Sequence, residues 1–552
     1  MAEQKIFARS RIQSSGVRAR KIFSEAVHGG KNGFEPLVII GFFLFSLFLM
    51  FHTFGYDGVQ KNILIARTLW SDFGSHIPLI RSFSMGNNFP PQYPIFPGEP
   101  IRYHFLFYML VGMLEKIGLR LDWALNLPSA LGFALLLWGI WSLAIALFKN
   151  KAIAFLSVLF FLFNGSLSFI KFFSRNPLTL ATFPAFGPWD GGVISAFWNL
   201  NIYTNQRHLA WGFALGIWFL ISVTKNKYRA VLWGIILGVL PYFHQPTLII
   251  MAVLMGSSFL VFPRLRLPIL ISASIGLLFI APQLLTMPKT GSLSWFPGYL
   301  LHNHLSLSTF LDFWFQNLGL HAILIPLGFF LIPKHTRHIL FPIAILFAIG
   351  NLFKFSMEVA ANHKFFNFAL ILGNMVSAYT IVFIKKRIGS IGSICLLVVL
   401  VVFLTLSGII DFFVILNDTK GTLPDVGNNK TATWIAANTP KDAIFLNSSF
   451  LYHPASLAGR KVFLGWPYFA WSAGYDTYGR MAKMRTMYES KNPTVFCLLL
   501  AKHHISFVTV EDTKNDPNLP RIDTKYFESL AKPVFADTEH ATWIYTTTDL
   551  CQ

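Results

Sequence analysis

Residues 37–55 read LVIIGFFLFSLFLMFHTFG, a continuous apolar run without Asp, Glu, Lys or Arg. A helix needs about 20 predominantly apolar residues to cross the hydrocarbon core of a bilayer. This run is long enough, and it predicts a membrane protein. About 35 mostly polar residues precede it, so we interpret it as a signal anchor rather than as a cleavable signal peptide.

Ten more apolar runs follow along the chain. They lie at 123–147, 152–170, 209–223, 230–243, 247–262, 268–285, 321–333, 339–353, 366–384 and 391–415. The composition agrees, because 54% of the 552 residues are hydrophobic and only 13% are charged, about half the share of a soluble chain. This excludes a soluble enzyme, a disordered chain and a repeat array. We therefore predict a multi-span α-helical protein with about 11 spans. A shorter run at 104–118 is expected to form a re-entrant or interfacial helix.

The net charge of +20 first suggests a nucleic-acid partner, but its placement argues against one. Eleven spans put the two ends of the chain on opposite sides of the membrane. The tail 1–35 and the five loops on its side carry the basic residues, whereas the nine acidic residues between 37 and 415 fall on the other side or at its membrane edge. The positive-inside rule makes the N-terminal side cytoplasmic.

The character of the chain changes near residue 416, where acidic residues return and hydrophobic runs shorten. We expect helices at 431–438 and 494–503 and strands at 443–447, 505–510 and 542–546. The prediction is a basic cytoplasmic tail (1–35), a transmembrane domain (36–415, first outer loop 56–122) and an extracytoplasmic α/β domain (416–552). The three cysteines, Cys395, Cys497 and Cys551, are too few for a disulfide framework and show no zinc spacing.

The first outer loop is the richest in candidate site residues. Asp72 and His76 are spaced i,i+4 and share one face of a helix, where an acid and an imidazole bind a metal or orient each other for proton transfer. Arg81 and Arg102 are suited to bidentate contact with a phosphate. The alternative is a solvated helix with a local Asp–His hydrogen bond.

Three later outer segments add candidates, each with a structural alternative. Asp190 precedes Gly-Gly and is either a second acid or a turn residue. Arg207 and His208 stand at a membrane boundary, where Arg207 meets a lipid phosphate or anchors at the headgroups. Lys364 is a further phosphate contact or a snorkelling lysine, and Lys354 and Glu358 are expected to pair at i,i+4. Aromatic residues at 451–478 suit sugar stacking or docking of the domain. Of these we select Trp466, Tyr468 and Tyr475.

These motifs resemble the GT-C superfamily of integral-membrane glycosyltransferases, which includes protein O-mannosyltransferases, aminoarabinose transferases of lipid A and oligosaccharyltransferase catalytic subunits. The resemblance rests on a single span followed by a long outer loop with an early acid, and on short motifs. These are Ser71-Asp72 through His76, Asn88-Phe89-Pro90-Pro91, Tyr103-His104, Asn205-Gln206-Arg207-His208, Asn362-His363-Lys364 and Leu464-Gly465-Trp466-Pro467.

The resemblance implies a polyprenyl-phosphate sugar as donor, inversion at the anomeric carbon and a first-loop acid as general base. Asp72 is our choice for the base, with Asp57 as the rival and His76 beside it. The same resemblance implies that cations and polar groups contact the donor, and for this we select Arg81, Arg102, His104, Asp190, Arg207, His208 and Lys364. The paired-acid motif of the oligosaccharyltransferases is missing, so the cofactor stays open, with Mg²⁺ or Mn²⁺ as the candidate cation.

Two readings from other classes compete with a transferase, a lipid or solute transporter and a non-catalytic membrane scaffold. The odd span number and the outer position of the acids argue against transport, because transporters place charges near the bilayer midplane and often show repeated halves. We therefore expect a multi-pass protein of a bacterial plasma membrane. Its partners would be a lipid-linked sugar, membrane lipid and a glycan, lipid or protein acceptor.

Overall fold

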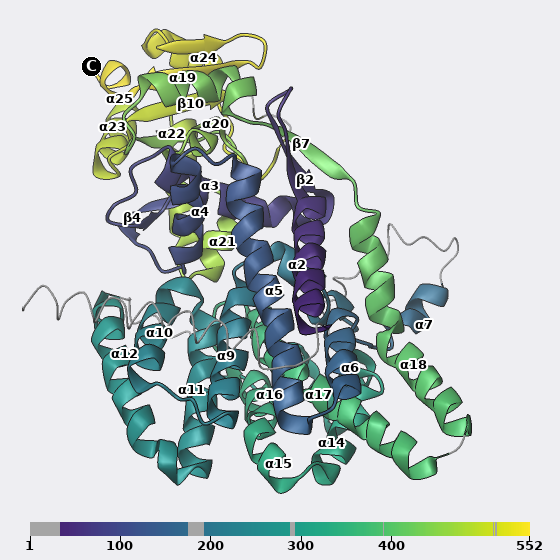
Figure 1. Cartoon of the computed structure of the whole chain (residues 1–552). Helices are drawn as coiled ribbons and strands as arrows, with labels where there is room; N and C mark the ends of the chain where they lie inside the picture. The colour runs from purple at the N-terminus through teal and green to yellow at the C-terminus, as the bar shows by residue number, and fades with distance from the viewer. Residues whose placement is uncertain (1–33, 175–191, 287–292, 390, 512, 514–515) are drawn as a thin grey trace, which may run out of the picture.

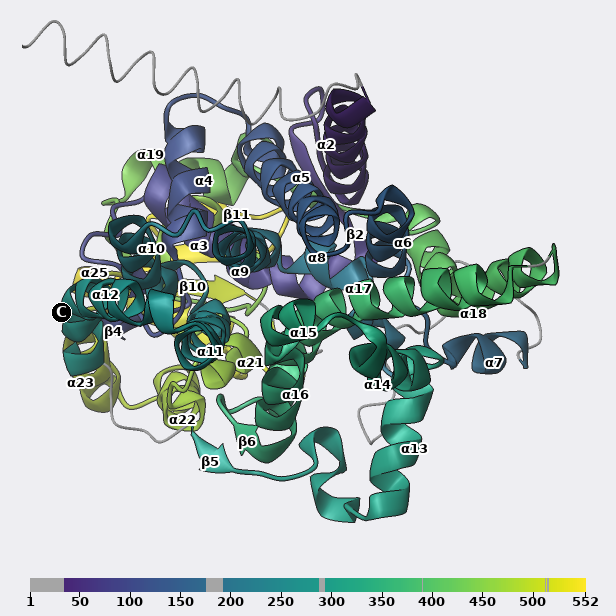
Figure 2. The same cartoon turned by 60° about the horizontal axis from the view of Figure 1, so that its bottom comes forward.

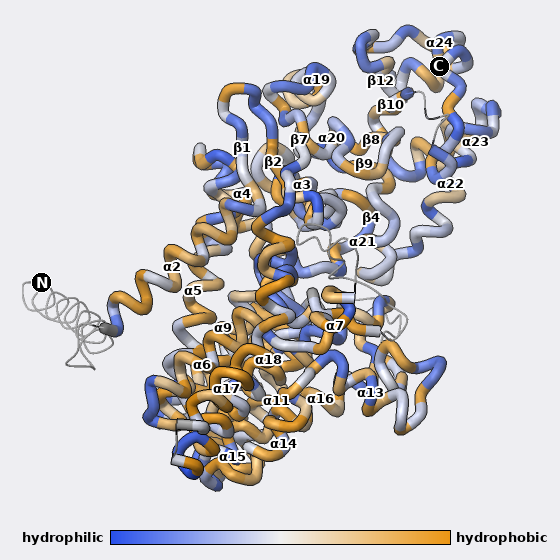
Figure 3. Tube along the Cα trace, turned by 90° about the vertical axis from the view of Figure 1, so that its right-hand side faces the viewer, coloured by the Kyte–Doolittle hydropathy of each residue, from blue (hydrophilic) through white to orange (hydrophobic). Residues whose placement is uncertain are grey.

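The computed structural model describes residues 34–174, 192–286, 293–389, 391–511, 513 and 516–552. The predicted basic tail therefore lies almost entirely outside the described residues. The chain forms two layers, a layer of apolar helices and an outer layer that carries the two larger sheets (Figure 1). Hydrophobic residues dominate the helical layer, and polar segments are concentrated in the outer layer (Figure 3).

Each of the eleven predicted apolar runs coincides over most of its length with a helix or overlaps one. These helices are α2 (Phe34–Thr53), α5 (Leu121–Phe148), α6 (Lys151–Leu162), α9 (Leu209–Thr224), α10 (Ala230–Phe243), α11 (Gln245–Val261), α12 (Arg266–Thr286), α14 (His321–Leu331), α16 (Pro342–Leu352), α17 (His363–Ile388) and α18 (Ile391–Leu416). Five helical stretches of the described residues are long and apolar enough to cross a membrane. A sixth is reached if α13 (Leu307–Leu318) and α14, bent by 89°, count as one span. The number eleven therefore stays a prediction, because several of these helices are shorter than a bilayer is thick.

Helix α17 is the centre of the helical layer. It packs against α6, α14 and α16, and most of its side chains are buried. Gly328 of α14 permits one close approach, since a Cβ there would lie 2.0 Å from Thr380 Oγ1. Helix α13 projects from the bundle (Figure 2). The tight packing gives α17 a fixed N-terminus, where Lys364 is the second residue of the helix, next to the outer layer.

The first outer loop is a folded unit rather than an open connection. It contains β1 (Phe54–Asp57), β2 (Asn62–Ala66), α3 (Trp70–Ser84), β3 (Gln92–Tyr93), β4 (Phe96–Pro100) and α4 (Leu106–Lys116). The run predicted as a re-entrant helix is α4, which packs on α3. Gly112 makes this contact possible, because a Cβ there would lie 2.6 Å from Ile80 O.

The chain after α18 forms an α/β unit built on a five-stranded sheet with the order β11-β12-β10-β8-β9. Its strands are β8 (Ile444–Leu446), β9 (Lys461–Val462), β10 (Phe507–Glu511), β11 (Phe535–Asp537) and β12 (Thr542–Thr546). Its helices are α19 (Lys430–Asn438), α20 (Pro454–Leu457), α21 (Pro467–Ser472), α22 (Thr477–Glu489), α23 (Pro493–Lys502), α24 (Thr524–Leu530) and α25 (Thr547–Leu550). The two helices and three strands predicted here correspond to α19, α23, β8, β10 and β12, with ends that differ by at most two residues.

The first outer loop and the C-terminal unit share structure that the sequence did not predict. Strand β7 (Lys420–Pro424), which follows α18, pairs antiparallel with β2. Residues Tyr93, Ile95 and Phe96 belong to the core of the C-terminal unit. A disulfide joins Cys497 to Cys551, so two of the three cysteines pair although they form no larger framework. The outer layer is therefore one body made from both ends of the chain.

Candidate active site

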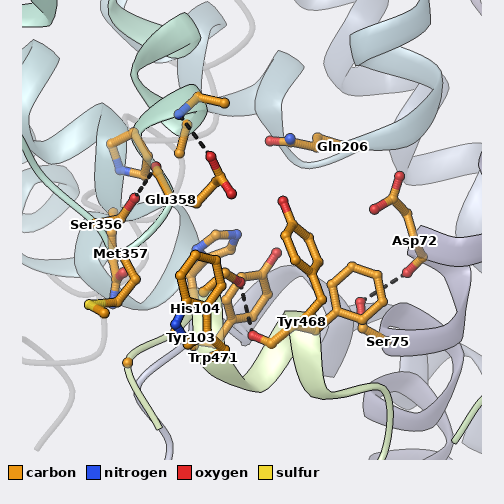
Figure 4. A pocket seen from close by; sticks show the side chains of 18 of the residues that line it. Asp72, Ser75, Tyr103, His104, Gln206, Ser356, Met357, Glu358, Tyr468 and Trp471 are labelled. Atoms are coloured by element: carbon orange, nitrogen blue, oxygen red, sulfur yellow. Dashed lines mark hydrogen bonds between the residues drawn. The ribbon is translucent and has the colours of Figure 1, made fainter. Parts of the chain in front are cut away.

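A cavity of about 810 Å³ lies where the outer layer meets the helical layer. Helix α3 forms one wall, the start of α17 and the segment before it form the opposite wall, and α21 covers both (Figure 4). The lining residues that matter below are Asp72, His76, Arg102, Tyr103, His104, Asn205, Gln206, Glu358, Lys364, Tyr468, Trp471, Tyr475 and Asp476.

Asp72 stands in the first turn of α3 and is half-buried in the cavity wall. Its Oδ2 accepts a hydrogen bond from Asn205 Nδ2 of α8 (Asn201–Asn205), so a residue distant in sequence fixes the carboxylate. Burial raises the pKa of Asp72, while the Asn205 hydrogen bond and the charge of Lys364 oppose the rise. A carboxylate with a raised pKa is a stronger base near neutral pH.

Glu358 lies across the cavity from Asp72, with the Tyr468 side chain between them (Figure 4). Lys364 lines the same cavity. Glu358 Oε1 accepts a hydrogen bond from Ala360 N at 3.1 Å. The Lys364 side chain is buried and interacts electrostatically with both acids. Burial and the charges of Glu358 and Asp72 raise the pKa of Tyr468, which keeps its hydroxyl neutral as a hydrogen-bond donor.

The expected pairing of Glu358 with Lys354 is not what the structure shows. Among the described residues Lys354 has no carboxylate within ion-pair distance, and its Nζ lies 5.7 Å from the centre of the Phe296 ring. Glu358 turns instead into the cavity. The i,i+4 spacing failed because residues 353–354 form strand β6 and not a helix.

His76 lines the cavity one turn after Asp72, as the spacing predicted. It stacks on Tyr108 with ring centres 4.8 Å apart, and in the described part of the chain it forms no ion pair with Asp72. Burial and the charge of Arg207 lower the pKa of His76 to about 3. A neutral imidazole of this kind shapes the wall but does not supply a cation.

His104 also lines the cavity, and a chain of hydrogen bonds holds it from behind. Its Nε2 lies 2.7 Å from His208 Nε2, and His208 Nδ1 lies 3.0 Å from the Tyr108 hydroxyl. His208 itself is fully buried and absent from the lining. The predicted donor contact by His208 is therefore replaced by a role in positioning His104.

Arg102 lines the cavity with its charge already engaged. Its guanidinium pairs with Glu99, donates to Gly474 O and lies 4.5 Å from the centre of the Tyr475 ring. The Tyr475 hydroxyl accepts a hydrogen bond from Arg102 N at 2.8 Å. Tyr475 thus holds Arg102 in the wall of the cavity.

Arg81 and Arg207 do not reach the cavity. Arg81 is 1% exposed and bridges Glu115 (3.3 Å) and Asp425 (2.8 Å). Arg207 is also 1% exposed. Its guanidinium donates to Thr204 O, Asn126 Oδ1, Met50 O and Thr53 Oγ1. Both arginines join elements of the fold, which the position of Arg81 in the first outer loop and of Arg207 at a predicted membrane boundary did not reveal.

Asp57 and Trp466 are also placed elsewhere. Asp57 Oδ1 accepts hydrogen bonds from Val59 N (2.9 Å) and Gln60 N (3.0 Å) in the turn between β1 and β2, so its carboxylate stabilises that turn. Trp466 packs edge-on against Phe450 at the border of the outer core. Neither residue lines the cavity. Asp190 lies outside the described residues.

Among the described residues that line the cavity, no three potential metal ligands lie close enough to share an ion. Three carboxylates, Asp72, Glu358 and Asp476, line it, and Lys364 interacts electrostatically with Asp72 and Glu358. Among the described residues, the group of three potential ligands close enough to share an ion is Asp537, Glu539 and His540, which does not line the cavity. Asp537 and Glu539 there already pair with His540 and Lys430. We assign no metal-dependent step.

Asn205 and Glu358 are the site residues that sequence reasoning placed least well. Asn205 was noted within the Asn205–His208 motif, but its contact with Asp72 spans 133 positions. Glu358 was read as an ion-pair partner. The available signal was charge density in a short loop between two apolar runs, which is costly unless it is used.

The chain matches a described protein family over part of its length, and its structure is similar to solved structures. Residues 76–198 match the model of a family described as "Uncharacterized membrane protein (DUF2298)". No curated protein matches the sequence.

Solved structures of the Archaeoglobus fulgidus oligosaccharyltransferase are similar to this chain. Its complex with Zn and sulfate is 13% identical (TM-score 0.48, 86% of this chain and 68% of that chain). The apo form is 14% identical (TM-score 0.44, 87% and 70%). The AglB complex with an inhibitory peptide and a dolichol-phosphate is 13% identical (TM-score 0.41, 86% and 69%). The family match itself covers 76–198, the part of the chain that begins at His76 in the cavity wall.

Proposed function

We propose that this protein is a membrane glycosyltransferase that moves a sugar from a polyprenyl-phosphate donor to an acceptor hydroxyl at the outer membrane face, with inversion. The observation that carries the proposal is Asp72, a half-buried carboxylate held by Asn205 in a cavity of about 810 Å³. The cationic Lys364 lines the same cavity and interacts electrostatically with Asp72. A base and a cation in one cavity suit displacement of a phosphate leaving group by an activated hydroxyl.

Asp72 is the proposed general base. It takes the proton of the acceptor hydroxyl as the oxygen forms a bond to the anomeric carbon. The bond between that carbon and the phosphate oxygen breaks, and its electron pair leaves with the lipid phosphate. Asn205 occupies one carboxylate oxygen, Oδ2, which leaves Oδ1 for the proton. Burial raises the pKa of Asp72 and so raises its strength as a base.

Lys364 is the proposed contact for the departing phosphate, with Arg102 at the rim. The negative charge on the phosphate grows as the sugar leaves, and a preorganised cation stabilises this charge more in the transition state than in the ground state. Lys364 is only 8% exposed, so little water competes for its ammonium. Tyr468 and Trp471 offer ring faces for the sugar and a hydroxyl donor beside Asp72.

The outer layer is proposed to face the extracytoplasmic side. The distribution of basic residues supports this orientation through the positive-inside rule. The Cys497–Cys551 disulfide supports it independently, because disulfides persist in oxidising compartments. The acceptor would be a cell-envelope glycan or glycolipid.

The test is incubation of the purified full-length protein in nanodiscs with a panel of polyprenyl-phosphate sugars and envelope glycans or glycolipids. We expect consumption of one donor, release of polyprenyl phosphate and a product with inverted anomeric configuration by NMR. Product with retained configuration contradicts the single displacement. No consumption of any donor, together with solute or lipid flux in sealed vesicles, supports the transporter instead.

A further inference from the structure

A second cleft, of about 430 Å³, lies beside the proposed active site in the outer layer. Strand β4 and its flanking residues form one side, and α22 and the C-terminal end of α23 form the other. Asp476 lines both the cleft and the cavity. The Glu99–Arg102 ion pair links them as well, since Glu99 lines the cleft and Arg102 lines the cavity. The cleft and the cavity therefore adjoin at Asp476.

Cations dominate the cleft. Its basic residues are Lys461, Arg480, Lys483 and Lys502, with His503 and His504 beside them, and its acids are Glu99, Asp442 and Asp476. Two of the acids are already engaged: Glu99 pairs with Arg102, and Asp476 Oδ1 accepts a hydrogen bond from Gly479 N at the start of α22. In the described part of the chain none of the four cations has a carboxylate within 4.0 Å.

Two of the four cations, Lys461 and Arg480, are built into the wall, whereas Lys502 is exposed. Arg480 is 7% exposed, and its guanidinium donates to Pro97 O at 3.0 Å and to Phe463 O at 3.3 Å. The guanidinium lies 3.8 Å from the centre of the Phe96 ring and 4.6 Å from that of Phe463. Lys461 is 9% exposed, with Nζ 3.3 Å from Gln92 Oε1. Buried charge is costly unless it is paired. Among the described residues His503 Nε2 is a buried atom without a hydrogen-bond partner. Burial and the cations around it lower the pKa of His503 to about 4.

The covered sheet edge and the side-chain cations of the cleft favour a saccharide over a peptide as the ligand. A peptide commonly binds beside a sheet by adding a strand to a free edge. The edge strand on this side, β9, is already covered, because Val462 N donates to Pro94 O and Gly465 N donates to Ile95 O, each at 2.9 Å. Side-chain cations are what remain for recognition, and they suit carboxylate or phosphate groups.

We propose that this cleft binds the anionic groups of an acidic saccharide acceptor, carboxylate or phosphate, while the acceptor hydroxyl lies in the cavity near Asp72. The inference rests on the proposed transferase function. It adds that the acceptor is acidic and that selectivity for it resides in Lys461, Arg480, Lys483 and Lys502 rather than in the residues around Asp72.

Binding can be measured without turnover. We would titrate the full-length protein in nanodiscs with hexagalacturonate, and with maltohexaose as the neutral saccharide of equal length, by isothermal calorimetry. The test variant is Lys483→Gln with Lys502→Gln. The matched control is Lys525→Gln with Lys532→Gln, which removes two exposed lysines from elsewhere in the same unit.

We expect hexagalacturonate to bind, maltohexaose not to bind, and the test variant to lose at least about fivefold in affinity while the control stays within about twofold. If inorganic phosphate competes with hexagalacturonate, the cleft accepts phosphate as well as carboxylate. If phosphate does not compete, the site needs a uronate. Either result supports the cleft. Equal binding of both saccharides, equal loss in both double variants, or no binding overturns the inference. No donor is present in this binding experiment. A failure of sugar transfer in the separate activity assay would therefore contradict the proposed function without affecting the binding result.

Discussion

Replacing Arg81 tests whether this arginine stabilises the fold or binds the donor. Arg81 NH2 lies 2.8 Å from Asp425 Oδ2 and 3.3 Å from Glu115 Oε1, and the three side chains are 1%, 8% and 9% exposed. Arg81→Met keeps most of the volume but leaves two buried carboxylates without a cation. Breaking a buried ion pair in this way costs about 3–5 kcal/mol.

The loss of Arg81 should appear as a lower unfolding midpoint of the purified protein, followed by intrinsic fluorescence on heating. The pH dependence has a definite sign. Burial already raises the pKa of Glu115 although Arg81 opposes the rise, and without Arg81 the pKa rises further. An acid whose folded-state pKa is raised destabilises the fold above that pKa, and the penalty disappears as the acid is protonated. The deficit of Arg81→Met should therefore be smaller at mildly acidic than at mildly alkaline pH.

Arg485→Met is the matched control, because Arg485 pairs with Glu489 at 3.3 Å with both side chains more than a third exposed. An exposed pair contributes about 1 kcal/mol or less. If Arg81→Met unfolds at the midpoint of the parent protein and instead loses affinity for a polyprenyl-phosphate sugar, Arg81 is a donor contact and our assignment is refuted.

Three further predictions concern the cavity. Asp72→Asn should lower turnover by about 10²–10⁴-fold. Its unfolding midpoint should equal or exceed that of the parent, because a neutral amide keeps an oxygen for Asn205 and avoids burial of charge. A large fall in the midpoint would show that Asp72 has a structural role. Burial raises the pKa of Asp72, so kcat/KM should fall with decreasing pH through a pKa above the ordinary value of about 4, and an acidic limb at or below that value would contradict the buried base. Lys364→Met should slow phosphate release at least about tenfold. Lys354→Met is the control, because Lys354 faces Phe296, and it should leave the rate of phosphate release unchanged. Equal effects of the two substitutions would show that Lys364 does not contact the donor.

Local patterns were sufficient to predict the helices and part of the outer unit. Each predicted apolar run coincides with or overlaps a helix because a long apolar segment buries its surface best when its backbone bonds are satisfied internally. The segments 431–438 and 542–546 were predicted to within one residue, and in the structure the Asn429 side chain caps the first. The pairing of β2 with β7 was missed, because its partners lie more than 350 positions apart.

The sequence analysis selected residues that line the cavity, but it did not predict the contacts around them. Asp72 and His76 were found from helical spacing, and Lys364 from its unusual charge at a membrane edge. Arg81 was misplaced because its acidic partners, Glu115 and Asp425, come from different segments. Single-sequence reasoning detects that a charge needs a partner, but it cannot tell a buried ion pair from a ligand contact.

The most direct test of Asp72 as the general base compares three proteins: the parent, Asp72→Asn and Asp57→Asn. Each is placed in nanodiscs with acceptor, and its consumption of a polyprenyl-phosphate sugar is measured. Both variants remove one carboxylate from the first outer loop, but only Asp72 lines the cavity. We predict that Asp72→Asn loses turnover and that Asp57→Asn keeps it. Turnover that survives in Asp72→Asn and disappears in Asp57→Asn would contradict the assignment of Asp72 as the base.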